Sequence, residues 1–146
     1  MKFMSHPEGV EFASPLRHVD GIDDVSHLRK WEIRGDASSV RLEEGEELIR
    51  ISPDRALLVG ARRRPDAQRV YDMTAALAAF EVEGEDLMRR LTELDLDELP
   101  AIGSILRGTP ALIERRGGDR FRLFVPQELG HFVAETVVDL RRGLGR

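Results

Sequence analysis

Short stretches in which apolar and polar residues alternate predict a chain built mainly from β-strands. In residues 27–33 (HLRKWEI), Trp31 and Ile33 lie on the same side of the alternation, so they are expected to face a core while Lys30 and Glu32 lie opposite. The glycine at position 35 would end this strand. The pattern therefore predicts a half-buried strand with one polar face.

The following stretch predicts a hairpin between two charged segments. Residues 47–60 are read as a strand, a Ser-Pro-Asp turn and a second strand. Before them, the acidic residues 36–47 carry few apolar side chains and allow at most one turn of helix after Asp36, a candidate N-cap. Residues 61–69 are predicted to be a charged linker.

Residues 69–100 contain the clearest succession of elements in the chain. An apolar strand is predicted at 77–84, where Gly84 allows a tight turn into a helix over residues 85–92. Apolar side chains follow at the spacing of one helical face: Leu87, Met88, Leu91 and Leu94. This unit predicts a strand next to an amphipathic helix.

The C-terminal part predicts a short strand, a hairpin and a longer helix. Strands near 110–115 and 120–125 flank Gly117 and Gly118, which can adopt the positive φ angles of a tight turn. Residues 127–142 predict an amphipathic helix. Its apolar face is expected to contain Leu129, Phe132, Val133, Val137 and Leu140.

Two parts of the chain repeat one order of residues. Asp24-Val25-Ser26 and Trp31-Glu32-Ile33-Arg34-Gly35 are matched by Asp72-Met73-Thr74 and Phe80-Glu81-Val82-Glu83-Gly84, and Asp54–Val59 is matched by Asp119–Val125. We therefore predict a single α+β domain over residues 1–146. Its mixed or antiparallel sheet would be built from two related halves, residues 23–60 and 69–142, with helices packed on one face.

Residues 1–22 predict an extended arm, because they lack the periodicity of a helix or a strand. The arm carries an unusual number of apolar side chains for a solvated tail: Phe3, Met4, Val10, Phe12 and Leu16. We expect Ser14-Pro15-Leu16 to pack on this domain. Met1–Phe12 is expected to become ordered mainly against another chain, since ordering costs about 1–2 kcal/mol per residue.

Composition narrows the classes of function. The chain has a net charge of −5 and no cysteine. The absence of cysteine excludes disulfides and thiolate catalysis and fits a reducing compartment, so we expect the cytoplasm. Basic residues do not cluster and aromatic residues make up only 5%, which argues against nucleic acid as a partner. No segment reaches the roughly 18 apolar residues of a membrane span.

Residues with catalytic or metal-binding chemistry do not form a recognisable set. The histidines, which are His6, His18, His27 and His131, are scattered, whereas zinc sites need paired ligands close in the chain. Ser26 and His27 are adjacent, so on a strand they would point to opposite faces and could not form a triad. We expect no catalytic, cofactor-binding or metal-binding residue in this chain.

Three stretches leave alternatives open. The run Arg62–Arg64 could bind an anion, but a solvated loop is the simpler interpretation because no glycine cradle accompanies it. The acids Glu93, Asp95, Asp97 and Glu98 could suggest calcium, yet the EF-hand glycine is absent, and Leu94, Leu96 and Leu99 are expected to be buried anchors between them. The pair Gly117-Gly118 could approach a phosphate, although a hairpin turn explains it fully.

Several segments together carry a resemblance to a known family. They are Ser14-Pro15-Leu16, Ile33-Arg34-Gly35-Asp36, Ser52–Gly60, Asp72-Met73-Thr74, Phe80–Gly84, Leu94-Asp95-Leu96, and Phe121–Val125 followed by the terminal helix. In this order and spacing, over roughly residues 14–140, the chain resembles the gamma subunit of heterotetrameric sarcosine oxidase. More distantly, it is similar to the folate-binding aminomethyltransferase fold of the glycine-cleavage T-protein.

The resemblance implies a structural subunit rather than an enzyme on its own. In that family the complex oxidatively demethylates sarcosine and passes the one-carbon unit to tetrahydrofolate, and FAD, FMN, NAD and tetrahydrofolate belong to the larger partner subunits. The catalytic, folate-facing aspartate of T-proteins has no clear counterpart here, since Gly117-Gly118-Asp119 is predicted to lie in a hairpin.

Three hypotheses about function follow. The first is a non-catalytic gamma-type subunit that packs on larger flavoprotein subunits of a sarcosine oxidase-like complex. The second is a stand-alone aminomethyltransferase-like protein that binds a folate or another one-carbon carrier. The third is a domain that forms a homo-oligomer and binds no ligand.

Overall fold

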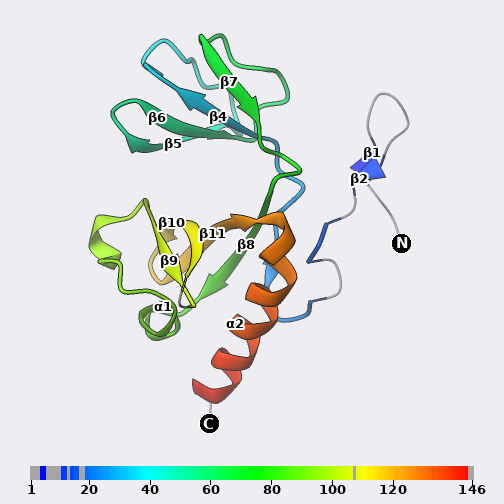
Figure 1. Ribbon diagram of the computed structural model, residues 1–146, viewed down its shortest axis with the longest axis vertical. Coiled ribbons are helices and arrows are strands. Elements are labelled where there is room, and N and C mark those ends of the chain that lie inside the picture. Colours follow the sequence, from blue (N-terminus) through cyan, green and yellow to red (C-terminus); the bar gives the residue numbers. More distant parts are fainter. Residues whose placement is uncertain (1–3, 6–10, 13, 17–18, 107, 145–146) are drawn as a thin grey trace.

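The strands of the molecule form two stacked antiparallel sheets, with helices on the outer face of one of them (Figure 1). The computed structural model describes residues 4–5, 11–12, 14–16, 19–106 and 108–144. The five-stranded sheet has the order β3 (Asp23–Asp24), β8 (Leu77–Glu83), β11 (Arg120–Pro126), β10 (Thr109–Gly117) and β9 (Ala101–Ile105). The four-stranded sheet has the order β5 (Glu47–Ser52), β6 (Arg55–Val59), β4 (Lys30–Arg34) and β7 (Arg69–Asp72).

Among the described residues, the helices cover the five-stranded sheet and leave the four-stranded sheet to loops. They are α1 (Glu85–Leu91) and α2 (Gly130–Leu144), and two short 3-10 turns, η1 (Leu96–Glu98) and η2 (Gln127–Leu129), precede β9 and α2. A core of buried apolar side chains lies between the helices and this sheet and includes Phe80, Met88, Leu123 and Val137. Both predicted helices are confirmed, as are the hairpin predicted at 47–60 and the one predicted with strands near 110–115 and 120–125.

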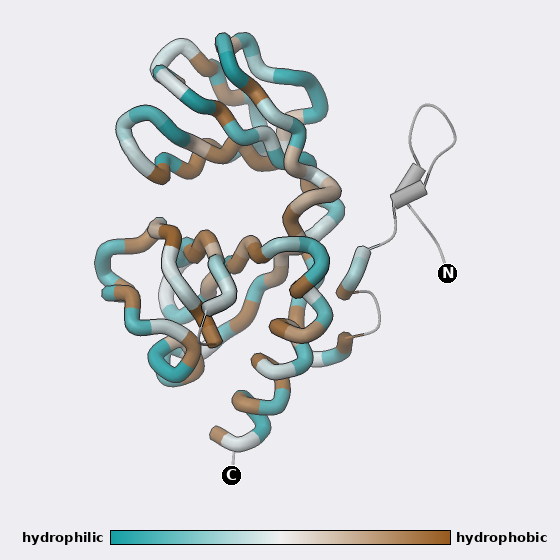
Figure 2. The backbone as a smooth tube through the Cα atoms, in the orientation of Figure 1, coloured by the Kyte–Doolittle hydropathy of each residue, from teal (hydrophilic) through white to brown (hydrophobic). Residues whose placement is uncertain are grey.

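The predicted apolar face of α2 and the turn η2 before it is confirmed at Val133 and Val137, which are buried, and at Leu129 and Leu140, which pack against the core, but not at Phe132. Along the helix, hydrophobic and hydrophilic residues alternate in bands (Figure 2). The buried stripe is formed by Gly130, Val133, Ala134, Val137 and Val138. The prediction that Phe132 lies in this stripe was wrong, because its side chain is 58% exposed. Small and β-branched residues let the helix lie close to β8, whereas the large ring points outward.

The predicted contact of Leu16 with the domain is confirmed, since this side chain is only 1% exposed and belongs to the core under α2. Gly130 makes room for it: a Cβ added there would lie 2.8 Å from the Cβ of Ala78 and 3.3 Å from Leu16. The strands β1 (Met4–Ser5) and β2 (Glu11–Phe12) pair with each other and stand off from both sheets in Figure 1. The prediction for the remainder of Met1–Phe12 lies outside the described residues.

The α+β class and the antiparallel pairing are confirmed, but the strands are divided between two sheets rather than joined in one. Ile49, Leu57 and Val59 of the four-stranded sheet pack against Ala79, Leu112 and Phe124 of the five-stranded sheet. The reason is that β6 carries apolar residues on both faces. A sheet with two apolar faces must be covered on both sides.

The outer face of the four-stranded sheet is covered by loops. Trp31 and Ile33 are buried there, as predicted, beneath Ala37 of the loop that follows β4 and Ala61 of the linker. The prediction that β4 is only half-buried was wrong, since Lys30 and Glu32 on its polar face are buried as well.

The helical turn proposed after Asp36 is also absent in this described stretch. Its carboxylate accepts a hydrogen bond from the backbone N–H of Ser38 at 2.9 Å, which forms a local turn instead.

Matching hydrogen bonds appear at matching positions of the predicted repeat. The N–H of Gly35 donates to the carbonyl of Asp54 at 2.6 Å, and the N–H of Gly84 donates to the carbonyl of Asp119 at 2.9 Å. Both glycines have positive φ angles, 101° and 127°, which disfavour a side chain. The order β5-β6-β4-β7 is therefore repeated by β10-β11-β8-β3.

The halves exchange their leading strands. The strand β3, which begins the first half, pairs with β8 of the second, while β7, which begins the second half, pairs with β4 of the first. Each sheet is thus completed by a segment from the other half of the chain.

Candidate functional site between the two sheets

The two exchanged segments meet at Lys30, between the sheets. After each leading strand, a hydroxyl residue accepts a backbone N–H: Ser26 Oγ from Ala79 and Thr74 Oγ1 from Lys30, both at 3.0 Å. Each turn is closed by an aspartate, because Asp24 accepts from the N–H of Ser26 and Asp72 from that of Thr74, also at 3.0 Å. The repeat noticed in the sequence therefore marks two equivalent turns that cross at the centre of the molecule.

The ammonium group of Lys30 holds these turns together. Its Nζ donates hydrogen bonds to the carbonyls of Ser26 at 2.6 Å, Thr74 at 3.1 Å and Leu77 at 2.9 Å. Burial lowers the pKa of Lys30 to about 8, even though Asp24 and Asp72 act in the opposite direction. With all three donors directed at backbone oxygens, this lysine has a structural role and is not presented to a substrate.

Ser26 is engaged in the same way. In addition to accepting the N–H of Ala79, its Oγ donates to the carbonyl of that residue at 3.2 Å. His27 is exposed and makes no contact with this hydroxyl. The hydroxyl is thus part of the backbone frame rather than an activated nucleophile.

One end of the layer between the sheets is charged. Arg122 is 1% exposed and donates through Nε to Glu114, while its Nη1 lies 3.5 Å from Glu47. Arg116 also contacts both carboxylates, with Nη2 donating to Glu47 at 3.0 Å. Burial raises the pKa of Glu114, although Arg122 opposes this, whereas the hydrogen bond from Arg116 lowers the pKa of Glu47. These groups neutralise one another, which accounts for their place in the interior.

The opposite end of the same layer opens into an apolar groove of about 320 Å³. We call it the inter-sheet groove. It is lined by Glu32, Ile51, Arg55, Leu57, Met73, Leu77, Ile102, Pro110, Ala111, Leu112, Phe124 and Pro126. Its size and composition are those of a small binding site.

The polar wall of the inter-sheet groove is a carboxylate held by two arginines. Glu32 Oε1 accepts from Arg55 Nη2 at 2.6 Å and Oε2 accepts from Arg34 Nε at 3.0 Å. Burial alone would raise the pKa of Glu32, but these hydrogen bonds outweigh it and hold the pKa below its usual value. Glu32 is therefore ionised at neutral pH and has its charge satisfied within the chain.

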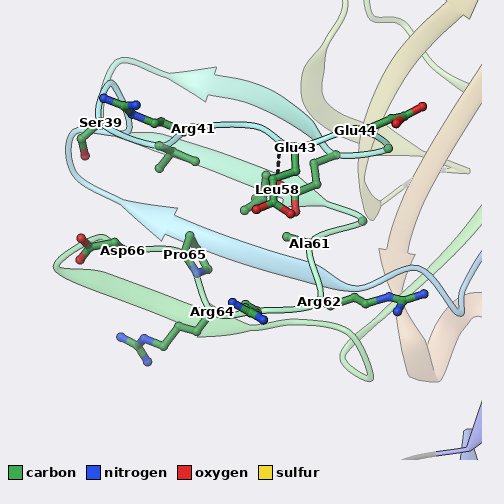
Figure 3. Close-up of a pocket in the computed structure, with 15 residues that line it drawn as sticks. Ser39, Arg41, Glu43, Glu44, Leu58, Ala61, Arg62, Arg64, Pro65 and Asp66 are labelled. Carbon is green, nitrogen blue, oxygen red and sulfur yellow. Dashed lines mark hydrogen bonds between the residues drawn. The ribbon is translucent and has the colours of Figure 1, made fainter.

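A second hollow of about 880 Å³ lies on the loops that cover the four-stranded sheet (Figure 3). Arg62–Arg64 lie on its wall, and within the described part of the chain their side chains make no ion pair. The hollow is lined by as many acids as arginines, namely Arg41, Arg62, Arg63, Arg64, Glu43, Glu44, Glu46 and Asp66. This balance favours the interpretation of a solvated loop over that of an anion site.

The remaining candidates are dispersed. His131 is exposed and lies 2.8 Å from Glu135 on the same helix, and His6 and His18 lie outside the described residues. The acidic residues from Glu93 to Glu98 are exposed around the buried Leu96, as the solvated interpretation predicts. Gly117 and Gly118 form the hairpin turn, with φ angles of 135° and 57°.

The described residues offer neither a metal-binding cluster nor a membrane-spanning helix. They contain no group of three or more histidine, aspartate or glutamate side chains placed to hold a metal ion. Among them there is also no helix that is both long and apolar enough to span a membrane.

Comparison with known proteins identifies the fold. A chain of the heterotetrameric sarcosine oxidase from Corynebacterium sp. U-96, in complex with pyrrole 2-carboxylate, matches this structure with a TM-score of 0.65 and 16% sequence identity. The match covers 87% of this chain and 93% of that chain, so the two have nearly the same extent. No protein-family model and no curated protein matches the sequence. At this identity the likeness establishes a shared fold.

Proposed function

We propose that this chain is a non-catalytic, gamma-type subunit of a heterotetrameric sarcosine oxidase-like complex in the cytoplasm. The observation that carries the proposal is the fold shared, over 87% of this chain and 93% of the other, with a chain of a heterotetrameric sarcosine oxidase. The complex would demethylate sarcosine oxidatively and pass the one-carbon unit to tetrahydrofolate in its larger subunits.

The buried polar groups support a structural rather than a catalytic role. Lys30 and Ser26 are bound to backbone atoms, and Arg122 is bound to carboxylates of its own chain. A catalytic acid, base or nucleophile must instead reach a substrate. All three groups are buried, and the Nη2 of Arg122, which has no hydrogen-bond partner among the described residues, is buried too.

We assign FAD, FMN, NAD and tetrahydrofolate to the partner subunits, because the residues described here do not fit these groups. The glycine pair at 117–118 lies in an exposed hairpin turn, whereas a phosphate cradle needs backbone N–H groups converging at a helix N-terminus.

Co-expression tests the proposal directly. The tagged chain would be produced together with the larger subunits of a heterotetrameric sarcosine oxidase, and the purified material would be examined by size-exclusion chromatography with mass analysis. We expect one complex that contains the chain, absorbs as a flavoprotein and releases hydrogen peroxide with sarcosine. Failure of the chain to enter the complex, or flavin bound to the chain alone, would contradict the proposal.

A second candidate, a stand-alone protein that binds a folate or one-carbon carrier, is favoured only by the inter-sheet groove of about 320 Å³. Calorimetric titration of the isolated chain with tetrahydrofolate separates the two. We expect no binding heat. Saturable binding in the micromolar range would favour this second candidate instead.

A further inference from the structure

A row of three arginines begins at Arg55, which lines the inter-sheet groove, and continues across the neighbouring strands. Arg55, Arg34 and Arg69 lie directly opposite one another on β6, β4 and β7, so their side chains share the face that looks toward the five-stranded sheet. Arg55 and Arg34 share the single carboxylate of Glu32, and Arg69 is exposed without an ion pair among the described residues. The row therefore has more cations than acids. Like charges placed opposite each other in a sheet repel, so an added carboxylate would be favourable here.

Exposed apolar groups flank the same row. Tyr71 is opposite Glu32 on β7 and is 48% exposed, and Ile102 on β9 lines the groove and is 40% exposed. The floor between them is formed by the buried side chains of Leu57, Leu112 and Phe124. Tyrosine and arginine around an apolar centre is the composition typical of binding hot spots between proteins.

We propose that the inter-sheet groove is the docking site for an extended segment of a larger partner subunit, which inserts an apolar side chain over Leu112 and Phe124 and places a carboxylate against Arg69 and Arg34. The inference rests on the proposed function, because it names where the partner is bound. The carboxylate follows from charge complementarity, since the row sets three arginines against Glu32 and the nearby Asp54. A second copy of this chain is a poorer occupant, because a two-fold contact would bring two arginine rows together.

Two substitutions on the rim test this site without touching the core. Ile102→Glu places a charge in the apolar contact, and Arg69→Glu reverses the unpaired charge of the row. Arg69→Glu also provides a new partner for Arg34, so the isolated chain should be at least as stable as before while its binding weakens. Matched controls are Leu42→Glu, at a side chain that is 49% exposed elsewhere, and Arg63→Glu, on the loop hollow.

The measurement is the dissociation constant between each variant and the purified larger subunits, determined by biolayer interferometry at two salt concentrations. We expect Ile102→Glu and Arg69→Glu to weaken binding about tenfold or more, and the controls to change it less than about twofold. For Arg69→Glu, the dependence of binding on salt should also become smaller. Circular dichroism and the thermal midpoint establish that each variant is folded.

Each failure has a separate signature. Absence of binding by the unmodified chain refutes the proposed function and this inference with it. Equal binding by Ile102→Glu and the unmodified chain refutes only the docking site. The alternative is a small-molecule site, probed with an aromatic acid such as indole-3-acetate. If this acid raises the thermal midpoint of the unmodified chain but not that of Ile102→Glu, while both bind the larger subunits equally, the assignment to a protein segment is overturned.

Discussion

The two sheets share one hydrogen-bond frame but differ in what covers their outer faces. Phe80 in β8 and Trp31 in β4 occupy matching positions of the repeat, and Phe80 is fully buried beneath helices. Trp31 lies beneath loops instead and donates its Nε1–H to the carbonyl of Ala61 at 2.7 Å. This difference shows that the hydrogen-bond frame shared by the two sheets forms with or without a helix packed on its outer face. A loop can replace the helix where it also offers an acceptor to a buried side chain with a polar end.

The largest effect is expected for Phe80→Ala, which removes the aromatic ring at the centre of the helix-covered core. We expect the free energy of unfolding to fall by about 3–5 kcal/mol, since the rigid surroundings cannot close the cavity. Urea denaturation would be followed by helix ellipticity and by the fluorescence of Trp31, the single tryptophan.

Coincidence of these two signals tests whether the sheets depend on each other. The shared interior of Leu57, Leu112 and Phe124 predicts one common midpoint. A variant that lost ellipticity while the Trp31 emission stayed native would show that the loop-covered sheet is stable by itself. Phe132→Ala, at an exposed ring on α2, serves as the control and should change the midpoint little.

A somewhat smaller loss is expected for Lys30→Met, which keeps the length of the side chain but removes its charge. The carbonyls of Ser26, Thr74 and Leu77 would lose a donor in the interior, and we expect a cost of about 3 kcal/mol. Equal stability of the variant would mean that the crossing of the two turns is held by packing alone.

The same residue predicts a dependence of stability on pH. The pKa of Lys30 is about 8 in the folded chain against an ordinary value of 10.5, so between these limits the unfolded state binds more protons than the folded state. The free energy of unfolding should therefore rise with pH over this window, by up to about 1.4 kcal/mol per pH unit from this group. The contribution should be absent in Lys30→Met. Only Lys2 and Lys30 occur in the chain, so the ¹³Cε resonances can verify the titration midpoint directly.

Ser26→Ala and Thr74→Val compare the two equivalent turns. Each removes the hydroxyl that accepts a buried backbone N–H, and we expect a loss of about 1–2 kcal/mol in both cases. Ser26 also donates to Ala79, so its substitution should cost slightly more. Chemical denaturation of both variants decides the order, and a negligible effect for either one would show that its turn is not needed for the frame.

The smallest effect should come from the ion pairs that repeat between the halves. Arg55 pairs with Glu32 at 2.6 Å, and at the matching positions Arg120 pairs with Glu81 at 2.7 Å. Because Arg120 is solvent-accessible, Arg120→Gln should lower the thermal midpoint only slightly, and the difference should vanish in 1 M salt, where the Debye length is about 3 Å. A large, salt-independent loss would show that this pair is not screened by solvent.

Local patterns were sufficient to predict most elements of the fold, whereas burial of charged residues was not predictable. The hairpins, both helices and the repeat follow from signals within a few residues of one another. The alternating pattern predicts a polar, exposed face for Lys30, whereas the structure buries it. Its acceptors are the carbonyls of Ser26, Thr74 and Leu77, and these come together only through the exchange of leading strands.

The division into two sheets was missed for a similar reason. It depends on which apolar face of β6 meets β10 and β11, and this is decided by contacts between distant segments. Glu32 and Arg122 were not recognised as parts of the layer between the sheets. For Arg122 a signal was present, because it is a charged residue inside a strand whose other positions are mostly apolar. For Glu32 there was none, because charged and apolar residues alternate along β4.

The exchange of leading strands has a consequence for how the chain reaches its final form during synthesis. After residues 23–60 have emerged from the ribosome, their sheet still lacks β7, and β3 has no strand to join until β8 has been made. Until then, the N-terminal half has an open sheet edge along β4. Pairing of this edge with other nascent chains competes with its pairing to β7. Cooperative folding begins only when residues beyond 83 are available, and a fragment ending at residue 60 is expected to aggregate.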